Sequence, residues 1–262
     1  FIEHAACEPE VVDLANFLIA MGATISGHGT PVIQIDGVSE LHGTHYRIIP
    51  DRIEAGTLLI ATAVLGGDVT VMGARHEHLG AVIETLREAN VQIEQIPARP
   101  ASSQEAGGPA RPDDRGVGGE GALRIRSDRQ LRAVDITTFP FPGFPTDLQA
   151  QIVAMMTVSQ GISVVTEKIY PERFMHVPEL RRMGAQITRE GPSAIVKGVE
   201  RLSGAPVSAS DLRASAALVI AGLAADNTTE LRGVEHLDRG YEQLERQLAE
   251  LGASIRREHQ DT

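Results

Sequence analysis

The sequence predicts an α/β fold built from repeated βαβαββ units with pseudo-threefold symmetry. The first observation is a repeated phrase: LIAMGATI, LREANVQI, LRRMGAQI and LAELGASI start at residues 18, 86, 180 and 248. The second is that strand-like and helical patterns alternate in the same order around each copy. The third is that one helix of each unit is apolar on nearly all sides, which is typical of helices in a protein interior.

The clearest unit runs from residue 131 to residue 197. Its pattern predicts a strand, a helix, a strand, a helix and a two-strand hairpin at residues 131–139, 146–161, 162–167, 173–184 and 185–198. Thr146 is the expected N-cap of the first helix, since threonine often caps helices. Gly184 is the expected stop of the second, because glycine readily adopts the left-handed conformation that ends helices.

The neighbouring units repeat this order. The preceding one predicts a strand, helix, strand, helix and hairpin at residues 45–49, 51–67, 68–73, 76–90, and 91–96 with 122–127. The following one predicts strand, helix, strand, helix and strand at residues 206–209, 210–226, 228–233, 239–252 and 253–258, with Ser210 as a helix cap. The first 43 residues supply half a unit, namely a strand, a helix at 9–22 and a hairpin at 23–37.

This parsing predicts two domains. Residues 1–45 are interpreted as the last part of an incomplete first domain, and residues 46–262 as the second domain. The abrupt strand-like opening at Phe1 leads us to expect a truncated chain. Residues 97–121 are rich in Pro, Gly and Ser and interrupt a hairpin, so a mobile surface insertion is expected there.

Composition narrows the functional class. The chain of 262 residues is 42% hydrophobic and 23% charged, which is ordinary for a globular protein. Apolar runs stay shorter than the roughly 18 residues of a membrane span, so no membrane association is expected. The net charge of −11 argues against nucleic-acid binding. One cysteine, Cys7, excludes an internal disulfide framework and a thiolate zinc cluster, and suits a cytosolic protein.

Three arginines stand near expected helix starts: Arg173, Arg213 and Arg239. Helix N-termini carry partial positive charge, so an arginine there is unfavourable by about 0.3–1 kcal/mol. An anion would explain the arrangement, because guanidinium groups and helix N–H groups together bind phosphate and carboxylate. The alternative is that each arginine pairs with a nearby acid or is solvated.

Asp147 is the best candidate for a general base. It follows the apolar segment FPFPGFPT, so partial desolvation is expected to raise its pKa. The alternative is an ordinary acid at a helix N-terminus. His76–His78 contains two histidines but lacks a third ligand nearby, which favours a surface turn. His176 is expected in the core or a cleft, and Cys7 is expected to be structural.

Six motifs then carry a family resemblance. FPTDLQAQ, ERFMHVPELRRMGAQI, DLRASAALVIAG, HLDRGYEQLERQLAELGA, ANFLIAMGATISGHGT and YRIIPDRIEAGTLLIA closely resemble the UDP-N-acetylglucosamine 1-carboxyvinyltransferase family. The resemblance implies an inside-out α/β barrel like that of 5-enolpyruvylshikimate-3-phosphate (EPSP) synthase. It implies transfer of the enolpyruvyl group of phosphoenolpyruvate to the 3′-hydroxyl of UDP-N-acetylglucosamine, without a cofactor. This reaction is the first committed step of bacterial peptidoglycan synthesis, in the cytoplasm.

The resemblance also implies roles for particular residues. Asp147 matches the proposed base, and the backbone of Ile169 matches a contact to the sugar nucleotide. The remaining matches are to the phosphoenolpyruvate and phosphate region of the family: Arg173, Asp211, Leu212, Arg213 and Arg239. Arg239 is expected to act in catalysis as well as in binding.

Departures from the family leave alternatives open. Most of the family's first domain is missing, with its Lys-Asn pair and the loop cysteine that acts as proton donor, and Cys7 is not that cysteine. We therefore expect this chain alone to lack transferase activity. One alternative is an EPSP synthase, although that family usually has a His-Arg motif where this chain has SDLRAS. Another is a non-catalytic module that binds an anion or a nucleotide.

Overall fold

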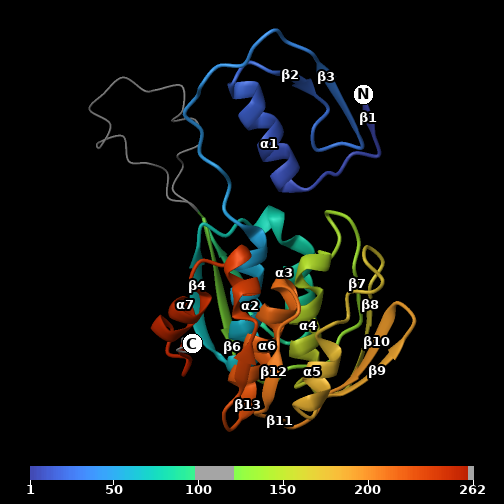
Figure 1. Cartoon of the computed structure of the whole chain (residues 1–262), viewed down its shortest axis with the longest axis vertical. Helices are drawn as coiled ribbons and strands as arrows, with labels where there is room; N and C mark the ends of the chain where they lie inside the picture. Colours follow the sequence, from blue (N-terminus) through green and yellow to red (C-terminus); the bar gives the residue numbers. More distant parts are fainter. Residues whose placement is uncertain (98–120, 259–262) are drawn as a thin grey trace.

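A computed structural model describes residues 1–97 and 121–258, which form two bodies joined by residues 37–51 (Figure 1). The smaller body, here called the N-terminal unit, comprises residues 1–36. Its helix α1 (Pro9–Ala20) packs on a three-stranded antiparallel sheet of order β1-β3-β2, with strands Ile2–Glu3, Val32–Asp36 and Thr24–Ser26. Proline suits the first turn of α1, because an N–H there lacks an intrahelical partner.

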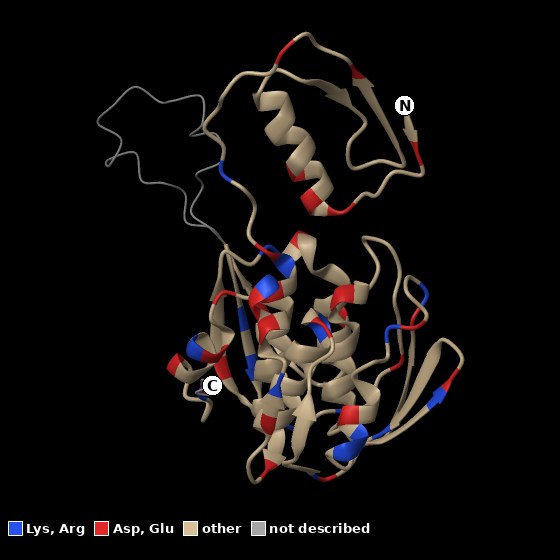
Figure 2. Cartoon of the chain, viewed as in Figure 1, with Lys and Arg blue, Asp and Glu red and all other residues tan. Residues whose placement is uncertain are grey.

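Three apolar helices form the centre of the larger body: α2 (Arg52–Leu65), α4 (Gln149–Met156) and α6 (Leu212–Ala224). Each contacts the other two, and their charged residues stand only near their N-terminal ends. Figure 2 shows the charges on the outside of the molecule and at the helix ends. Burial of nearly every α4 side chain confirms the expectation that the first helix of each unit lies inside.

Sheets surround this triad. The first has order β4-β6-β5 and strands Gly67–Met72, Ala122–Ser127 and Gln92–Ile96, all antiparallel. The second has order β7-β8-β10-β9 and strands Ile136–Thr137, Ile162–Thr166, Ser193–Lys197 and Gln186–Glu190. The third side has two parallel pairs, β11 (Leu202–Ser203) with β13 (Ala225–Asp226) and β12 (Pro206–Ser208) with β14 (Glu230–Arg232). The three central helices therefore lie inside and the sheets outside, while the strands of the described residues form no closed ring.

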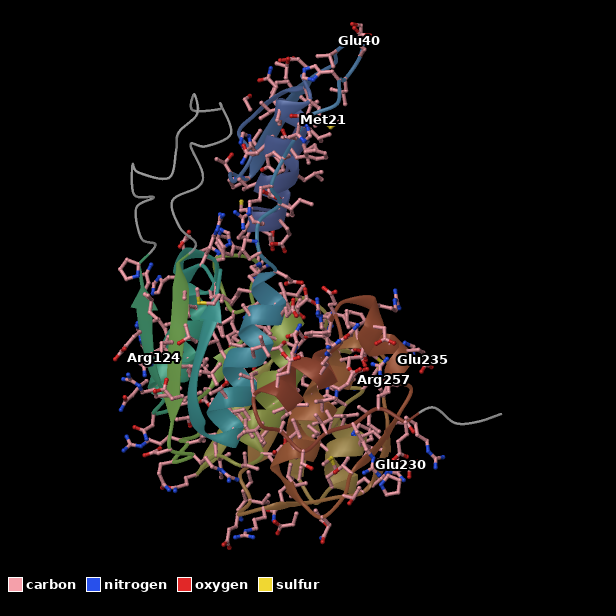
Figure 3. All side chains as sticks on the ribbon, turned by 90° about the vertical axis from the view of Figure 1, so that its left-hand side faces the viewer. Met21, Glu40, Arg124, Glu230, Glu235 and Arg257 are labelled. Carbon is pink, nitrogen blue, oxygen red and sulfur yellow. The ribbon has the colours of Figure 1, made fainter. Side chains whose placement is uncertain are left out.

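Amphipathic and short helices complete each unit. The outer helices are α3 (Gly80–Glu88), α5 (Val177–Arg182) and α7 (Leu244–Glu250). The 3₁₀ turns are η1 (His76–His78), η3 (Thr146–Leu148) and η4 (Val234–Arg239). Charged pairs lie on the outer surface, where Asp68 accepts hydrogen bonds from Arg124 and Arg126. Figure 3 shows the Arg124 side chain on the outer side of the first sheet. These exposed pairs add little stability.

Several predicted strands are shorter or absent. In segment 131–139 only Ile136–Thr137 forms a strand, joined to β8, because Arg132 makes an isolated bridge to Gln160 instead. Residues 45–49 form no strand: the Tyr46 hydroxyl and the Ile49 amide are bound to Asp13 of α1. Residues 253–258 form none either.

Both predicted threonine and serine caps are wrong. The Thr146 hydroxyl donates to Glu167, and Thr146 is the first residue of the 3₁₀ turn η3, whose N-cap is Pro145. In α6 the cap is Asp211, and Ser210 donates to the Asp211 carboxylate. The expected mobile insertion lies almost wholly outside the described residues, but pairing of β5 with β6 confirms the hairpin that it interrupts.

Candidate functional site

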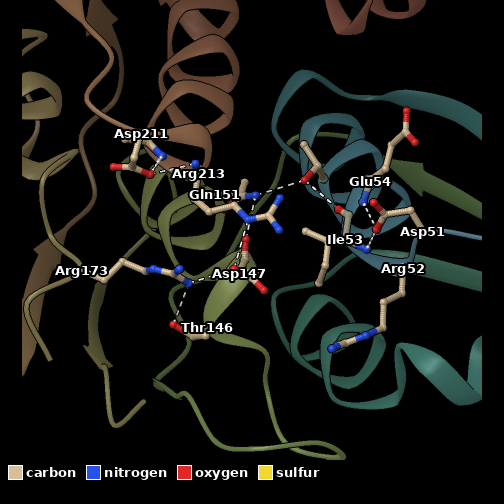
Figure 4. Close-up of polar contacts among 12 residues, drawn as sticks. Asp51, Arg52, Ile53, Glu54, Thr146, Asp147, Gln151, Arg173, Asp211 and Arg213 are labelled. Carbon is tan, nitrogen blue, oxygen red and sulfur yellow. Dashed lines mark hydrogen bonds and ion pairs between the residues drawn. The ribbon is translucent and has the colours of Figure 1, made fainter. Parts of the chain in front are cut away.

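The starts of the three central helices meet at one end of the triad (Figure 4). At α2, Asp51 Oδ1 accepts hydrogen bonds from the backbone amides of Ile53 and Glu54 at 2.7 and 3.1 Å. At α6, Asp211 Oδ1 accepts from Arg213 and Ala214 at 2.9 and 3.0 Å. Such caps satisfy amides that the helix itself leaves unpaired. The chain thereby gathers helix N-termini, with their partial positive charge, around one place.

Asp147 stands at this place, between two arginines. Its Oδ1 lies 2.9 Å from Arg173 Nη1 and 3.1 Å from Arg213 Nε. Asp147 comes from the turn before α4, Arg173 from the loop before α5, and Arg213 from the first turn of α6. The side chains of Arg173 and Arg213 are 24% and 17% exposed, so both charges are partly shielded from water. Two of the three predicted arginines and the predicted base therefore meet.

The expected rise in the pKa of Asp147 is wrong. Burial alone raises the pKa of this carboxyl, as the apolar flank suggested, but the charges and hydrogen bonds of Arg213 and Arg173 outweigh burial. The net result is a pKa below the ordinary value, so Asp147 is held as a carboxylate. Burial lowers the pKa of Arg213, yet Asp147 and Tyr241 raise it overall, which keeps the guanidinium charged.

A buried polar cluster lies beneath the ion pairs and joins the three units. Gln151 Nε2 of α4 donates to Thr57 Oγ1 of α2 at 3.1 Å and to the Tyr241 hydroxyl at 3.2 Å. The Thr57 and Tyr241 hydroxyls are 2.8 Å apart. The Asp147 carbonyl is a third acceptor, 3.0 Å from the same nitrogen, so the two hydrogens of Gln151 Nε2 are shared among three oxygens and link this cluster to the backbone of Asp147. The sequence did not reveal it, because the three residues are far apart along the chain.

Arg239 is not part of this contact network. It is the exposed last residue of η4, and it forms no hydrogen bond or ion pair with other residues of the described ranges. Its neighbour Gly240 packs tightly on Leu212, since a Cβ at Gly240 would lie 2.7 Å from Leu212 Cδ2. The backbone of Arg239 is thus close to the start of α6, while its side chain is left in solvent.

Ile169 lies in the loop after β8, and the buried Glu167 carboxylate holds the backbone of this loop. The amides of Ile169 and Tyr170 donate to Glu167 Oε1 at 2.8 and 3.0 Å. The side chains of Ile169 and Tyr170 are 43% and 51% exposed, and Arg173 lies 5.9 Å from the centre of the Tyr170 ring. Sequence reasoning missed Glu167 and Thr146 as parts of the site, because nothing in their local pattern marks them.

Arg52, at the start of α2, does not join the cluster around Asp147 and binds Glu10 of the N-terminal unit instead. It donates from Nε and Nη2 to the two carboxylate oxygens of Glu10 at 3.0 and 2.9 Å. Its guanidinium also lies 5.7 Å from the centre of the Phe141 ring. This bidentate pair connects the N-terminal unit to the larger body. Burial raises the pKa of Glu10, but Arg52 brings the net pKa below the ordinary value.

The structure gives no sign of ligand binding by the remaining candidates from the sequence, His76–His78, His176 and Cys7, among the described residues. His76–His78 forms a 3₁₀ turn, and no group of three or more metal-binding side chains occurs among the described residues. His176 is buried in the core beside Phe174, and burial lowers its pKa to about 4. Cys7 is partly buried, with Sγ 3.7 Å from the Ala5 carbonyl. Within residues 1–97 and 121–258, every helix is too short or too polar to cross a membrane.

Relatives match nearly the whole chain. Proteins named UDP-N-acetylglucosamine 1-carboxyvinyltransferase from Geotalea daltonii and Nitratidesulfovibrio vulgaris are 51% identical over 256 residues and 53% identical over 257 residues. Each match covers 98% of this chain and 56% of the relative, so the chain spans little more than half the length of these relatives. Their names confirm the resemblance seen in the sequence motifs.

Solved structures and a family model agree on the fold. The enolpyruvyl transferase NikO from Streptomyces tendae is similar with a TM-score of 0.78 at 25% identity, over 97% of this chain and 55% of that one. EPSP synthase from Acinetobacter baumannii has a TM-score of 0.55 at 20% identity, over 79% and 43% of the two chains. The model of the EPSP synthase (3-phosphoshikimate 1-carboxyvinyltransferase) family matches residues 1–248. The chain therefore belongs to the EPSP synthase family, and its sheets and central helices have the fold of the enolpyruvyl transferases.

Proposed function

We propose that this chain carries the anion-binding and proton-accepting groups of a UDP-N-acetylglucosamine 1-carboxyvinyltransferase. The reaction transfers the enolpyruvyl group of phosphoenolpyruvate to the 3′-hydroxyl of UDP-N-acetylglucosamine and releases phosphate. The observation that carries the proposal is the pair of guanidinium groups, from different units, on one oxygen of Asp147 where helix N-termini meet. The names of the relatives at about half identity support the choice of reaction.

The arginines would bind the substrate that has two anionic groups. Arg173 uses one nitrogen, Nη1, for both Thr146 and Asp147, and a guanidinium has five N–H donors in all. Arg213 stands on the other side of Asp147, and Arg239, whose side chain now lies in solvent, would have to turn inward to join them. Together they would hold the carboxylate and phosphate and stabilise charge in the tetrahedral adduct. Asp211 and Leu212 would shape this end through the cap of α6, and Ile169 through its backbone.

Asp147 would accept the proton of the attacking 3′-hydroxyl. The two arginines keep it ionised, which is the state that a base needs, but their attraction also makes it a weak base. An anion bound to the arginines would add negative charge beside Asp147 and draw their hydrogen bonds away. The pKa of Asp147 would then rise. Binding of phosphoenolpyruvate would in this way activate the base.

Substrate choice and organisation are parts of the same proposal. Residues 1–45 would be the last part of a first domain, and residues 46–262 the second, with no cofactor between them. The product would enter peptidoglycan synthesis in the cytoplasm. EPSP synthase activity is the second candidate because the matching family model has that description. A non-catalytic anion-binding module of the same fold is the third.

The test joins this chain to the part of the Geotalea daltonii relative that it does not cover. Phosphate release from phosphoenolpyruvate is measured with UDP-N-acetylglucosamine and, separately, with shikimate 3-phosphate. We expect turnover with the sugar nucleotide only, and a loss of about 10²- to 10⁴-fold in Asp147→Asn. Release with shikimate 3-phosphate alone would support EPSP synthase. Phosphoenolpyruvate binding without turnover would support the non-catalytic module. The unjoined chain is the control and is expected to be inactive.

A further inference from the structure

Glu167 has an unusual environment for a carboxylate. It directly follows β8 and is fully buried, at 0% exposure. Burying an ionised carboxylate is costly unless charges or hydrogen bonds compensate. Among the described residues it has no arginine or lysine partner, and four hydrogen-bond donors surround it instead: Thr138 Oγ1, Thr146 Oγ1 and the amides of Ile169 and Tyr170. A buried acid maintained in this way calls for an explanation.

The donor geometry fixes the direction of each hydrogen bond. Thr138 Oγ1 donates to Oε1 at 2.6 Å, and Thr146 Oγ1 donates to Oε2 at 2.9 Å. A hydroxyl has one hydrogen, and an ionised carboxylate only accepts. The Thr146 oxygen can therefore only accept from its other neighbour, which is Arg173 Nη1 at 3.0 Å. Glu167 thus obliges Thr146 to present lone pairs to Arg173.

The same logic applies on the other side of the carboxylate. Thr138 gives its hydrogen to Glu167, so its oxygen accepts from the amide of Lys168 at 2.9 Å. With the amides of Ile169 and Tyr170, this fixes three consecutive backbone N–H groups after β8. Glu167 consequently ties the turn that carries Asp147 to the loop that carries Ile169 and, farther along, Arg173.

We propose that Glu167 is a positioning residue that aligns Arg173 with Asp147 through the Thr146 hydroxyl. This inference rests on the proposed function, since Arg173 must contact the anionic substrate for its alignment to matter. Arg173 Nη1 binds Thr146 and Asp147 simultaneously, so the rotation of the guanidinium is set by both. Losing the Glu167–Thr146 bond frees the hydroxyl to rotate and to turn its hydrogen toward the cation.

The hydrogen bonds that run from Glu167 through the Thr146 hydroxyl to Arg173 are here called the relay. Two variants break this relay at different points. Glu167→Gln keeps the shape but removes the charge and replaces one acceptor oxygen by a donor. Thr146→Val removes the hydroxyl that links Glu167 to Arg173 and leaves the buried acid in place. Ser163→Ala is the matched control, because Ser163 is a buried polar residue of β8, the strand that precedes Glu167, and its hydroxyl donates to the Val134 carbonyl and not to Thr146 or Arg173.

Phosphoenolpyruvate binding to the 262-residue chain and its variants is measured by titration calorimetry, with urea unfolding alongside. We expect Kd to rise about tenfold or more in each of the two variants, because this is the loss in affinity that corresponds to one hydrogen bond to a charged group. The double variant should be no weaker than the weaker single variant, because both changes break one relay. Ser163→Ala should keep Kd within about twofold even if it loses stability.

The outcomes separate the two proposals. If the unaltered chain does not bind phosphoenolpyruvate, the same titrations are made on the chain joined to the missing part of the Geotalea daltonii relative, and absence of binding there as well overturns both the proposed function and the role of Glu167. If the unaltered chain binds it and Thr146→Val leaves Kd unchanged, only the relay is overturned, and Glu167 is structural. Additive effects of Glu167→Gln and Thr146→Val would overturn the relay as well. A loss of stability in Glu167→Gln does not blur this result, because Thr146→Val tests the same link without altering the buried charge.

Discussion

Gly56, in the middle of α2, allows the packing beneath the site to be tested quantitatively. A Cβ added at Gly56 would lie 2.4 Å from Leu148 Cδ1, closer than real Cβ contacts, and Leu148 is fully buried. On an open helix surface, Gly→Ala stabilises by about 1 kcal/mol. Overpacking a filled interior costs about 1–3 kcal/mol. Gly56→Ala should therefore lower the free energy of unfolding by up to about 2 kcal/mol.

The same substitution should reach the site, because Leu148 is the residue after Asp147. Either Leu148 leaves its rotamer or α2 shifts away from α4, and both displace the turn that holds the carboxylate between its arginines. Urea unfolding measures the stability change as a shift in midpoint at constant m-value. Titration with phosphoenolpyruvate should show weaker binding in parallel.

Two controls decide whether the reasoning is correct. Gly80→Ala, at the first residue of α3, meets no atom within 4 Å and should not be destabilising. In a Leu148→Ala background the space is open, so Gly56→Ala should become stabilising by about 1 kcal/mol. If Gly56→Ala stabilises the chain while Leu148 is present, the three central helices are not packed as tightly as described, and the argument fails.

Three further predictions concern charged residues. Arg239→Ala should weaken phosphoenolpyruvate binding in calorimetry while leaving urea unfolding unchanged, since its side chain lies in solvent; an unchanged Kd would remove it from the site. Asp211→Ala should lower the free energy of unfolding by about 1 kcal/mol through loss of the α6 cap, and Asp211→Asn should lose less; equal losses would contradict a capping role. Because the folded-state pKa of Asp147 is lowered, its contribution to stability is present above the unfolded pKa and is lost as pH falls through the folded pKa. Arg173→Met should raise that pKa and shrink the contribution, so carboxyl ¹³C titration should show Asp147 protonating at higher pH, and an unmoved titration would mean that Arg173 does not stabilise the carboxylate.

The parts of the fold that were predicted well are those that depend on the pattern of polar and apolar residues within one segment. The central helices are apolar on all sides, and burial is the only setting that suits such a helix. Segment 122–127 alternates polar and apolar residues, and β6 occupies that range in the structure. Segment 131–139 failed because alternation does not say which strand supplies hydrogen bonds, and only Ile136–Thr137 finds a partner in β8.

The residues of the site were predicted only where their place in a helix or turn determines where they lie in the fold. Arg173 and Arg213, both near the starts of helices, come together as predicted, whereas Arg52 at the start of α2 pairs with Glu10 instead. Thr146 looked like a cap, but its hydroxyl is taken by Glu167, which lies 21 residues farther along the chain. Asp147 was expected to have a raised pKa because burial can be inferred from an apolar flank, whereas the distance to two cations cannot. Arg239 stays in solvent because a helix start fixes a backbone, not the direction of a long side chain.

The Arg52–Glu10 pair has a mechanical consequence. The Arg52 side chain is only 8% exposed while it is paired with Glu10, so the N-terminal unit covers the guanidinium as well as neutralising it. The Glu10 side chain is 56% exposed, so opening the joint would exchange a bidentate ion pair for hydration of both groups. The two bodies should accordingly separate only when this bidentate pair breaks.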